Sequence, residues 1–480
     1  MLVKYTVIAA LSFLLAACAS PDGIGHRGSP ASPGDLAAGE SLKGAASGDW
    51  PAADWWKRLG DPQLDALVDE ALGASPSMRI AQARVDRAAA LAQAAAAALG
   101  PTAALSADVT RQRYSANGFF PPPIAGSTYT TTQIGAGFGY ELDFWGRNRA
   151  AYDAALGRRR AAEADAFAAR LVLSSAVASA YVRLARAYDQ LALARLALEQ
   201  REAVQRLTLQ RVSAGLDSQL ELKQVETSIP AARARIAQLN EEIALARNQL
   251  AALAGKGPDR GLALKPPTLK LAPVALPSVL PAELLARRPD VAASRMRVEA
   301  ALRDTRVARA AFYPNVNLNA LLGYQAISWT KLLEPGSLVP TLGAAVRLPL
   351  FDGGRLRGEL AGREADYDLA VEQYNQSLVE GLREVVDQLA TLRALEVQRT
   401  EVEAALVSAE EAYRLATTRY QGGLGTLLQV IAAEVPVLEE RTARADLQAR
   451  ALAASIDLAR ALGGGYEATQ DATAEGTERK

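Results

Sequence analysis

Cysteine and histidine, two residue types that often carry chemistry, occur only once each among the 480 residues. A disulfide framework or a Cys/His zinc site needs more than one such residue, so the composition excludes both. Lys and Arg total 53 and Asp and Glu total 53, which gives a formal net charge of zero. A nucleic-acid footprint needs a clustered basic excess, so we expect no nucleic-acid partner. No nucleophile–base or metal-ligand pattern is present, so we expect no catalytic residues, no metal, no cofactor and no enzyme activity.

The chemistry that remains is covalent modification of the single cysteine, Cys18. A short apolar segment follows Lys4, which is typical of a signal peptide and is too short for a membrane helix. Leu15-Ala16-Ala17-Cys18 then resembles the bacterial lipobox. We therefore expect residues 1–17 to be removed and Cys18 to carry a covalent lipid such as palmitate. The alternative is an ordinary signal peptide with an incidental cysteine.

Residues 18–50 are rich in Pro, Gly, Ser and Ala. This composition predicts a lipidated flexible tether. His26 lies in this segment, and we interpret it as a solvated linker residue and not as a metal ligand.

The remaining chain is an internal repeat with a period near 210 residues. Arg211-Val212-Ser213-Ala214-Gly215-Leu216-Asp217-Ser218 corresponds to Arg419-Tyr420-Gln421-Gly422-Gly423-Leu424-Gly425-Thr426. Each half reads helix, strand, strand, very long helix, glycine turn, helix. We expect the first repeat at 51–255, an equatorial linker at 256–281, the second repeat at 282–464, and a partly disordered C-terminal equatorial tail at 465–480.

The helices that position the two glycine turns are expected at 147–212 and 218–253 in the first half, and at 355–420 and 426–463 in the second. A helix of about 65 residues is roughly 100 Å long, so it must pack along neighbours and not inside a globular core. Apolar residues in the shorter helices recur every seven residues, which predicts left-handed supercoiling.

Four segments of alternating polarity predict strands at about 102–113, 128–142, 315–326 and 340–351. Strands of about ten residues with one apolar face fit a transmembrane barrel. Four strands cannot close a barrel, and open edges are not tolerated in lipid, so the chain must form oligomers. Three copies would supply twelve strands. The expected fold is a mostly α, mixed α+β membrane protein with four long paired helices and four transmembrane strands.

Several motifs together resemble the TolC-like outer-membrane efflux family, and within it the NodT or OprM-like lipoprotein branch that serves resistance–nodulation–division pumps. The motifs that carry this resemblance are Trp55-Trp56 with Asp61-Pro62-Gln63-Leu64, Glu141 to Arg147, Arg287-Arg288-Pro289-Asp290, Ala310 to Pro314 and Pro349 to Arg355. The resemblance implies a homotrimer with a twelve-strand barrel on a twelve-helix barrel. It also implies a belt drawn from residues 50–60, 255–281 and 463–480.

The resemblance further implies a passive exit duct for small molecules, of the kind that confers drug resistance. Its partners would be a periplasmic adaptor, an inner-membrane pump of the resistance–nodulation–division type and outer-membrane lipid. The adaptor would dock on two tips, Gly215-Leu216-Asp217-Ser218 and Gly423-Leu424-Gly425-Thr426. Their exposed leucines are the expected contacts, while glycine and the hydroxyl residues also suit a helix turn and cap.

The periplasmic gate is expected at Leu428, which matches an apolar ring position of the family. The family's charged gate positions fall at Ala432 and Val435, so this sequence departs from a charged gate. Closure is expected to depend on Leu428 with Glu221 or Glu434, or to be looser; Glu434 as a solvated helix-face residue is the alternative.

Two other functions stay open at this point. One is a duct for type I protein secretion, although such ducts usually lack a lipobox. The other is a non-conducting periplasmic coiled-coil scaffold lipoprotein, which leaves the four strands unexplained.

Overall fold

The computed structural model of the chain describes residues 20–43, 47–270, 276–277 and 287–467. The predicted lipidation residue Cys18 and the tail 468–480 lie outside the described residues. The chain forms two compact units, each built from both halves of the repeat. We call them the strand unit (1–30, 84–162 and 294–374) and the hairpin unit (31–83, 163–293 and 375–480).

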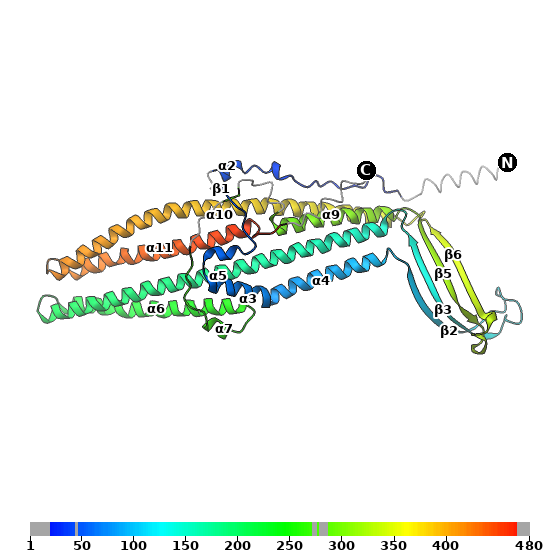
Figure 1. Cartoon of the computed structure of the whole chain (residues 1–480), viewed down its shortest axis with the longest axis horizontal. Coiled ribbons are helices and arrows are strands. Elements are labelled where there is room, and N and C mark those ends of the chain that lie inside the picture. The colour runs from blue at the N-terminus through cyan, green and yellow to red at the C-terminus, as the bar shows by residue number, and fades with distance from the viewer. Residues whose placement is uncertain (1–19, 44–46, 271–275, 278–286, 468–480) are drawn as a thin grey trace. The chain divides into compact units, whose positions relative to one another are not determined.

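The strand unit contains one four-stranded antiparallel sheet in the order β2-β3-β5-β6 (Figure 1). Its strands are β2 (Thr102–Arg113), β3 (Thr128–Leu142), β5 (Asn315–Ala326) and β6 (Leu338–Arg347). Two short 3-10 turns, η3 (Trp329–Lys331) and η4 (Pro335–Ser337), lie between β5 and β6. In the single chain, β2 and β6 are the edge strands.

The pairing register gives the sheet two chemically different faces. Pairs such as Leu105↔Ala136, Phe138↔Ala320 and Val316↔Val346 place apolar residues on one face. Pairs such as Glu141↔Asn317 and Asn315↔Arg347 place polar residues on the other. Leu105, Phe138, Leu322, Leu342 and Val346 are exposed. The predicted alternation is therefore confirmed, and an apolar sheet face lacks a cover within the chain.

The strand predicted at 340–351 is shifted in the structure, since β6 spans Leu338–Arg347. Pairing ends at Arg347 because its partner Asn315 is the first residue of β5. Pro349 follows and has no N–H with which to continue a ladder. The apolar alternation of Leu348 and Leu350 therefore extends past the end of the strand.

Glycine is required where β3 and β5 cross most closely. Gly135 and Gly323 are direct partners, and a Cβ on Gly323 would lie 2.6 Å from the Cα of Gly135. Glycine at positions 135 and 323 therefore allows the close approach of β3 and β5.

The strands lead into helices at two equivalent motifs. The Asp143 carboxylate accepts from the amides of Asn148 and Arg149 (3.1 and 2.8 Å) at the start of α5 (Arg147–Ser213). Asp352 accepts from the amide of Leu356 (2.9 Å) at the start of α10 (Arg355–Gln421). These motifs therefore fix where the long helices begin. Their counterparts before the strands are α4 (Pro76–Ala97) and α9 (Pro289–Ala310), of 22 residues each.

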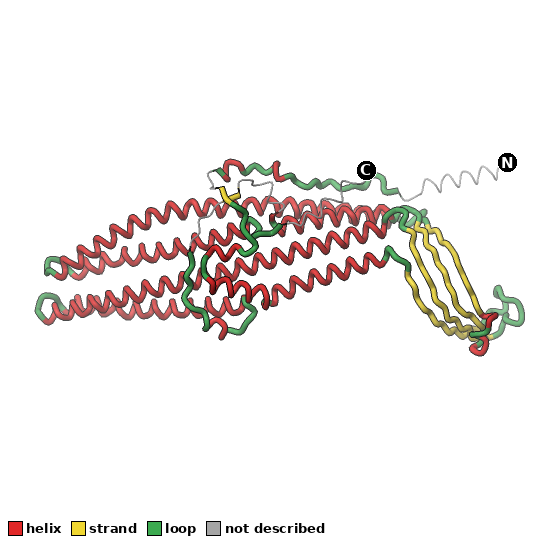
Figure 2. The backbone as a smooth tube through the Cα atoms, in the orientation of Figure 1, coloured by secondary structure: helices red, strands yellow, loops and turns green. Residues whose placement is uncertain are grey.

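The hairpin unit consists mainly of two long helical hairpins (Figure 2). In the first, α5 leads to α6 (Gln219–Leu253), and in the second, α10 leads to α11 (Leu427–Ala461). The long helices have 67 residues each and the short ones 35 each, so the predicted repeat of element order is confirmed. Pro230 and Pro436 lie inside α6 and α11, which continue through them.

The main core lies where the hairpin helices meet the segment around η2 (Trp55–Leu59) and α3 (Pro62–Ala74). Trp56, Leu64, Tyr181, Leu184 and Leu239 are almost completely buried there. The Tyr181 hydroxyl donates to Asp61 Oδ2 at 2.7 Å, and the Thr268 amide donates to the same oxygen at 2.8 Å. Burial raises the pKa of Tyr181.

The described parts of the three predicted belt stretches lie together. Lys270 donates its amide to the Leu59 carbonyl, and a Cβ on Gly465 would lie 2.3 Å from the Ala53 nitrogen. Gly465 has a φ of 81°, so only glycine suits this turn. Two small elements complete the region: α7 (Asp259–Leu262) and the parallel pair of β1 (Ser47–Gly48) with β4 (Leu276–Pro277).

The N-terminal segment differs from the expected flexible tether. Within the strand unit, the amides of Arg27 and Gly28 donate to Asp368 (2.9 and 2.8 Å). His26 Nδ1 lies 3.0 Å from Glu364 Oε2 and its ring packs on Tyr367, so His26 is held against α10 and is not a free linker residue, although its side chain is 39% exposed. Farther along, η1 (Pro33–Asp35) and α2 (Gly39–Leu42) belong to the hairpin unit. Composition could not predict these contacts, because Asp368 lies about 340 residues away from Arg27 and Gly28 in the sequence.

Candidate gate and docking tips

The two hairpin tips share one backbone design. Gly215 and Gly423 have φ values of 73° and 74°. The following leucine amides donate back to the preceding helix, Leu216 to the Arg211 carbonyl and Leu424 to the Arg419 carbonyl, both at 2.8 Å. This six-to-one bond after a left-handed glycine is the Schellman ending of a helix.

Each tip then starts a new helix with a capping box. The Ser218 amide donates to Glu221 at 2.9 Å, and the Thr426 amide donates to Gln429 at 3.2 Å. The hydrogen bond with Ser218 lowers the pKa of Glu221. Both turns present their leucine outward, with Leu216 67% and Leu424 77% exposed. The tips are therefore rigid supports for one exposed apolar side chain each.

A polar network, which we call the latch, joins the two hairpins beside the tips. It consists of Thr208, Arg211, Asp217 and Tyr420. The Arg211 guanidinium donates to both Asp217 oxygens (2.8 and 3.0 Å) and to the Tyr420 carbonyl (3.0 Å). The Tyr420 hydroxyl donates to Asp217 at 2.6 Å and lies 3.1 Å from the Thr208 hydroxyl. Three residues of the α5–α6 hairpin thus hold one residue of α10.

The latch stabilises the charged form of Asp217 and the neutral form of Tyr420. The Arg211 guanidinium lowers the pKa of Asp217, and the Tyr420 hydroxyl lowers it further. Burial raises the pKa of Tyr420, and the hydrogen bond with Asp217 raises it further. The guanidinium also lies 4.5 Å from the centre of the Tyr420 ring. A charged Asp217 and a neutral Tyr420 are therefore the stable forms across the neutral pH range.

The latch is backed by an apolar cluster of Val225, Tyr420, Leu427 and Val430. Farther from the tips, Arg201 of α5 donates to Glu434 of α11 (3.3 Å) and to the Ser228 carbonyl (3.2 Å). Glu434 is only 9% exposed. Arg201 and Glu434 therefore form a second, shielded link between the hairpins.

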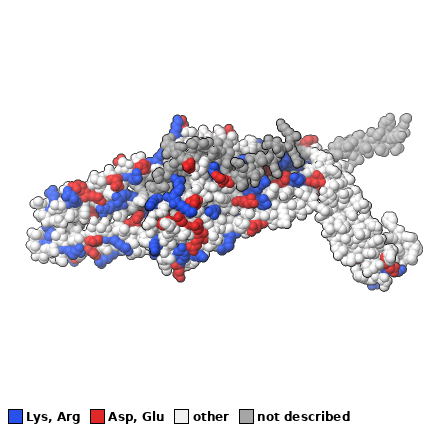
Figure 3. Space-filling model, viewed as in Figure 1, with Lys and Arg blue, Asp and Glu red and all other residues white. Residues whose placement is uncertain are grey.

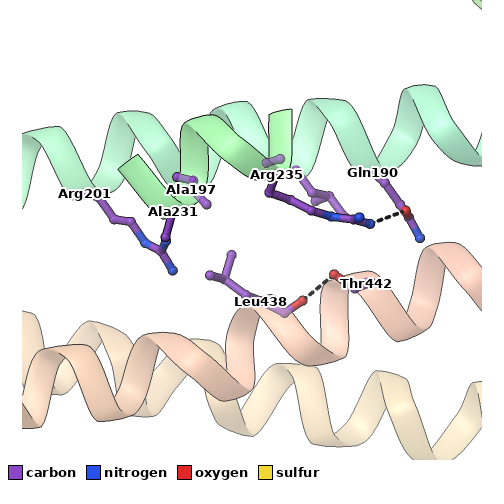
Figure 4. Close-up of a pocket in the computed structure, with 10 residues that line it drawn as sticks. Gln190, Ala197, Arg201, Ala231, Arg235, Leu438 and Thr442 are labelled. Atoms are coloured by element: carbon purple, nitrogen blue, oxygen red, sulfur yellow. Dashed lines mark hydrogen bonds between the residues drawn. The ribbon is translucent and has the colours of Figure 1, made fainter. Parts of the chain in front are cut away.

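A cavity of about 220 Å³ lies between α5, α6 and α11 beside this link (Figure 4). Small side chains create it, including Ala197 of α5 and Ala231 of α6. Arg235 lies along it and donates to Gln190 at 3.0 Å, as Figure 4 shows. At this level the hairpins therefore meet across an open space and not through a packed seam.

The start of α11 presents an apolar stripe. Leu428 is 65% exposed, whereas its neighbour Leu427 is buried against the latch cluster. Ala432 and Val435 follow at spacings of four and three residues and are also exposed. All three therefore lie on one face of the helix.

The structure places the predicted site residues in three different settings. Leu216, Leu424 and Leu428 are exposed, as docking and gating would require. Glu221 is bound in a capping box and Glu434 pairs with Arg201, so neither carboxylate lies on the Leu428 stripe. The expected role of these two acids in the gate remains a prediction, and a solvated Glu434 is wrong. Asp217 is part of the latch. The turns and caps are formed by the remaining tip residues, Gly215, Ser218, Gly423, Gly425 and Thr426.

Sequence reasoning missed the latch. Its signal was a break in the repeat, because Asp217 and Tyr420 correspond to Gly425 and Val212 in the other half. Two of the residues at which the tips differ, Asp217 and Tyr420, bind each other.

Comparison with known proteins supports the resemblance to an outer-membrane efflux family. The outer membrane efflux protein family matches residues 67–256 and 280–464. The multidrug resistance outer membrane protein MdtP of Shigella flexneri is 36% identical over 432 residues, or 88% of each chain. The fusaric acid resistance protein FusA of Burkholderia cepacia is 39% identical over 363 residues, 75% of this chain and 68% of FusA.

A solved structure shows the same fold. The outer membrane protein VceC of Vibrio cholerae superposes with a TM-score of 0.82 at 39% identity, over 87% of this chain and 100% of VceC. Both the family and the fold are those of channel-type efflux proteins. The chain therefore belongs to the outer membrane efflux protein family and serves as an outer-membrane exit duct for efflux.

Proposed function

We propose that three copies of the chain form a gated exit duct that conducts small molecules. The exposed edges of β2 and β6 and the uncovered apolar face of the sheet support this proposal. In lipid, every backbone polar group needs a partner, so the two edges must pair with other copies. Three sheets supply twelve strands, an even number that suits a closed barrel. The apolar face then contacts lipid and the polar face lines the lumen.

Figure 3 agrees with this placement. On the side shown, the sheet carries almost no charged atoms until its loop end. There, Arg111, Arg113, Lys331 and Glu334 are exposed. A band without charge between charged ends is what a membrane-spanning sheet requires.

We also propose that Cys18 carries a lipid that holds the strand unit at the membrane. Two residues after Cys18, the Ser20 carbonyl accepts from Arg357 Nη1 at 2.7 Å. Arg357 lies in the first turn of α10, shortly after β6 ends. The docked N-terminal segment would thus keep the acylated residue near the strands. Two or three acyl chains would make the attachment stable.

The Leu428 stripe of α11 is the proposed gate. In a trimer, three copies of Leu428, with Ala432 and Val435 behind them, would form an apolar constriction that closes by excluding water. The latch and the Arg201–Glu434 pair would hold the two hairpins of each chain in the closed position. Gating would then consist of separating Tyr420 from Asp217 and Arg211.

Leu216 and Leu424 are the proposed contacts of a periplasmic adaptor, which would join the duct to an inner-membrane pump of the resistance–nodulation–division type. Both leucines are exposed on turns that hold their backbone rigidly, so their exposure has no structural benefit. The names of the relatives, multidrug resistance and fusaric acid resistance, favour small organic molecules as the solutes.

The uncovered apolar sheet face carries this proposal, and the mass of the purified protein in detergent tests it. A trimer that dissociates on heating is expected. A monomer, or a trimer that gives no conductance in a planar bilayer, would instead favour the non-conducting scaffold.

A further inference from the structure

A charged cavity lies within the strand unit where the strands meet the helices. Its volume is about 460 Å³, and three arginines line it: Arg147, Arg347 and Arg355. Two carboxylates, Glu141 and Glu359, also line it. The lining of the cavity therefore carries one excess positive charge in each chain.

The register places this cavity on the polar side of the sheet. Glu141 pairs with Asn317, and Asn315 pairs with Arg347, so these residues share one face. The opposite face at the same level carries Leu142, Val316 and Val346. If the apolar face contacts lipid, as in the proposed function, the cavity opens toward the lumen.

Two of the three arginines are paired within the cavity. Arg147 lies 2.9 Å from Glu141, and Arg355 lies 2.8 Å from Glu359. Arg147 and Arg355 are also the first residues of α5 and α10. A cation at a helix N-terminus opposes the helix dipole, and the paired carboxylates Glu141 and Glu359 offset this effect.

Arg347 is the excess charge. It is the last residue of β6 and is exposed, and in the described part of the chain its guanidinium has no hydrogen-bond or ion-pair partner. The one further charged strand residue on the polar face is Asp108 of β2. It lies six residues from Thr102, which is the first residue of β2 and marks the end of this strand nearest the cavity. That separation is roughly 20 Å, about two Debye lengths at 0.1 M salt.

We infer that these residues form a cationic selectivity ring at the inner end of the barrel, which favours anionic solutes such as carboxylates. This inference depends on the proposed trimeric duct. Three copies would bring nine arginines and six glutamates to one level, a surplus of three positive charges around the lumen. Rings of charged side chains set the ion preference of a channel when ions must pass close to them.

The test is the reversal potential of the full-length protein in a planar bilayer across a potassium chloride gradient at low salt. Wild type should prefer chloride over potassium. Arg347→Gln should lower the chloride-to-potassium permeability ratio on the order of threefold, and Arg347→Glu should reverse the preference. Arg347→Lys should keep the wild-type ratio because it preserves the charge.

Arg357→Gln is the matched control. It removes a positive charge from the same part of α10, but Arg357 holds the Ser20 carbonyl and does not line the cavity. Its permeability ratio should equal that of wild type. Intact currents with the same ratio in wild type, Arg347→Gln and Arg347→Glu would overturn the ring alone. No current from any folded trimer would overturn the proposed duct and the ring with it.

Discussion

The two tips have the same backbone and different chemistry. Both end a helix with a left-handed glycine, expose a leucine and begin the next helix with a capping box. Only the first tip has a carboxylate in its turn, at Asp217, where the second has Gly425. A Cβ at Gly425 would lie 3.2 Å from the Tyr420 nitrogen and 3.1 Å from Gln429, so this turn has little room for a side chain.

Because its two tips differ, the repeated chain has a specific bond between its halves. Two identical tips would leave the hairpins with no complementary pair. Because the first tip has the acceptor Asp217 and the end of α10 has the donor Tyr420, one hairpin can hold the other. The shared features of the tips suit docking, and their differences suit closure.

The largest effect is expected from Asp217→Ala. This change removes both carboxylate contacts of Arg211 and the acceptor of the Tyr420 hydroxyl. Hydrogen bonds to charged groups contribute about 2 kcal/mol, so the ratio of closed to open channels should fall roughly 30-fold. Single-channel open probability measures this ratio. Leu424→Ala is the control at the other tip, because its side chain is 77% exposed and is not part of the latch. Equal opening by both variants would contradict the distinction between the tips.

Tyr420→Phe should have a smaller effect. The ring stays over Arg211 and the backbone bond from Arg211 remains, while the hydroxyl contacts with Asp217 and Thr208 are lost. About 1 kcal/mol, or roughly a fivefold increase in opening, is expected. Tyr413→Phe, in the partly buried edge of the same cluster, is the control. A Tyr420→Phe channel that opens as rarely as wild type would exclude the hydroxyl from the latch.

The latch should be insensitive to pH near neutrality. The pKa of Asp217 is lowered from 3.8, so its contribution is present above that pH and is lost only as the pH falls through the lower folded value. The pKa of Tyr420 is raised from 10.0, so its contribution is present below that pH and is lost only as the pH rises through the higher value. Open probability should therefore be flat from about pH 5 to 9. A step within that range would implicate another group.

Leu216→Asp and Leu424→Asp should leave the gate nearly unchanged. Both side chains are exposed, and surface substitutions usually alter the free energy of unfolding by less than about 0.5 kcal/mol. Drug susceptibility of cells that depend on this duct should nevertheless rise, with normal amounts of trimer and normal conductance. Unaltered susceptibility in the double variant would exclude the leucines from docking.

The sequence predicted the long helices to within a residue, because local signals mark their ends. Asp143 and Asp352 cap their beginnings, and the glycines at 215 and 423 follow their ends. The end of β6 was harder to predict, since it depends on where the partner β5 begins. The alternation of apolar residues continues to Leu350 and does not show which residues pair with β5.

The candidate site could be predicted only in part. Leu216 and Leu424 were predicted because they are exposed leucines in the turns that the family resemblance implies as docking tips, and Leu428 was predicted because it matches an apolar ring position of the family. The pairs Arg201–Glu434 and Tyr420–Asp217 could not be found from spacing, because the two residues of each pair lie more than 200 residues apart and on different elements. The docking of His26 on Glu364 was missed for the same reason.

Single-channel conductance of the purified trimer, with Leu428→Ser beside wild type, shows most directly whether an apolar ring closes the duct. A duct closed by an apolar ring should give rare, brief openings in wild type. Leu428→Ser should open more often because water enters a polar constriction. Large steady currents in wild type would contradict a closed gate, and silence from a folded trimer of both proteins would contradict the duct itself.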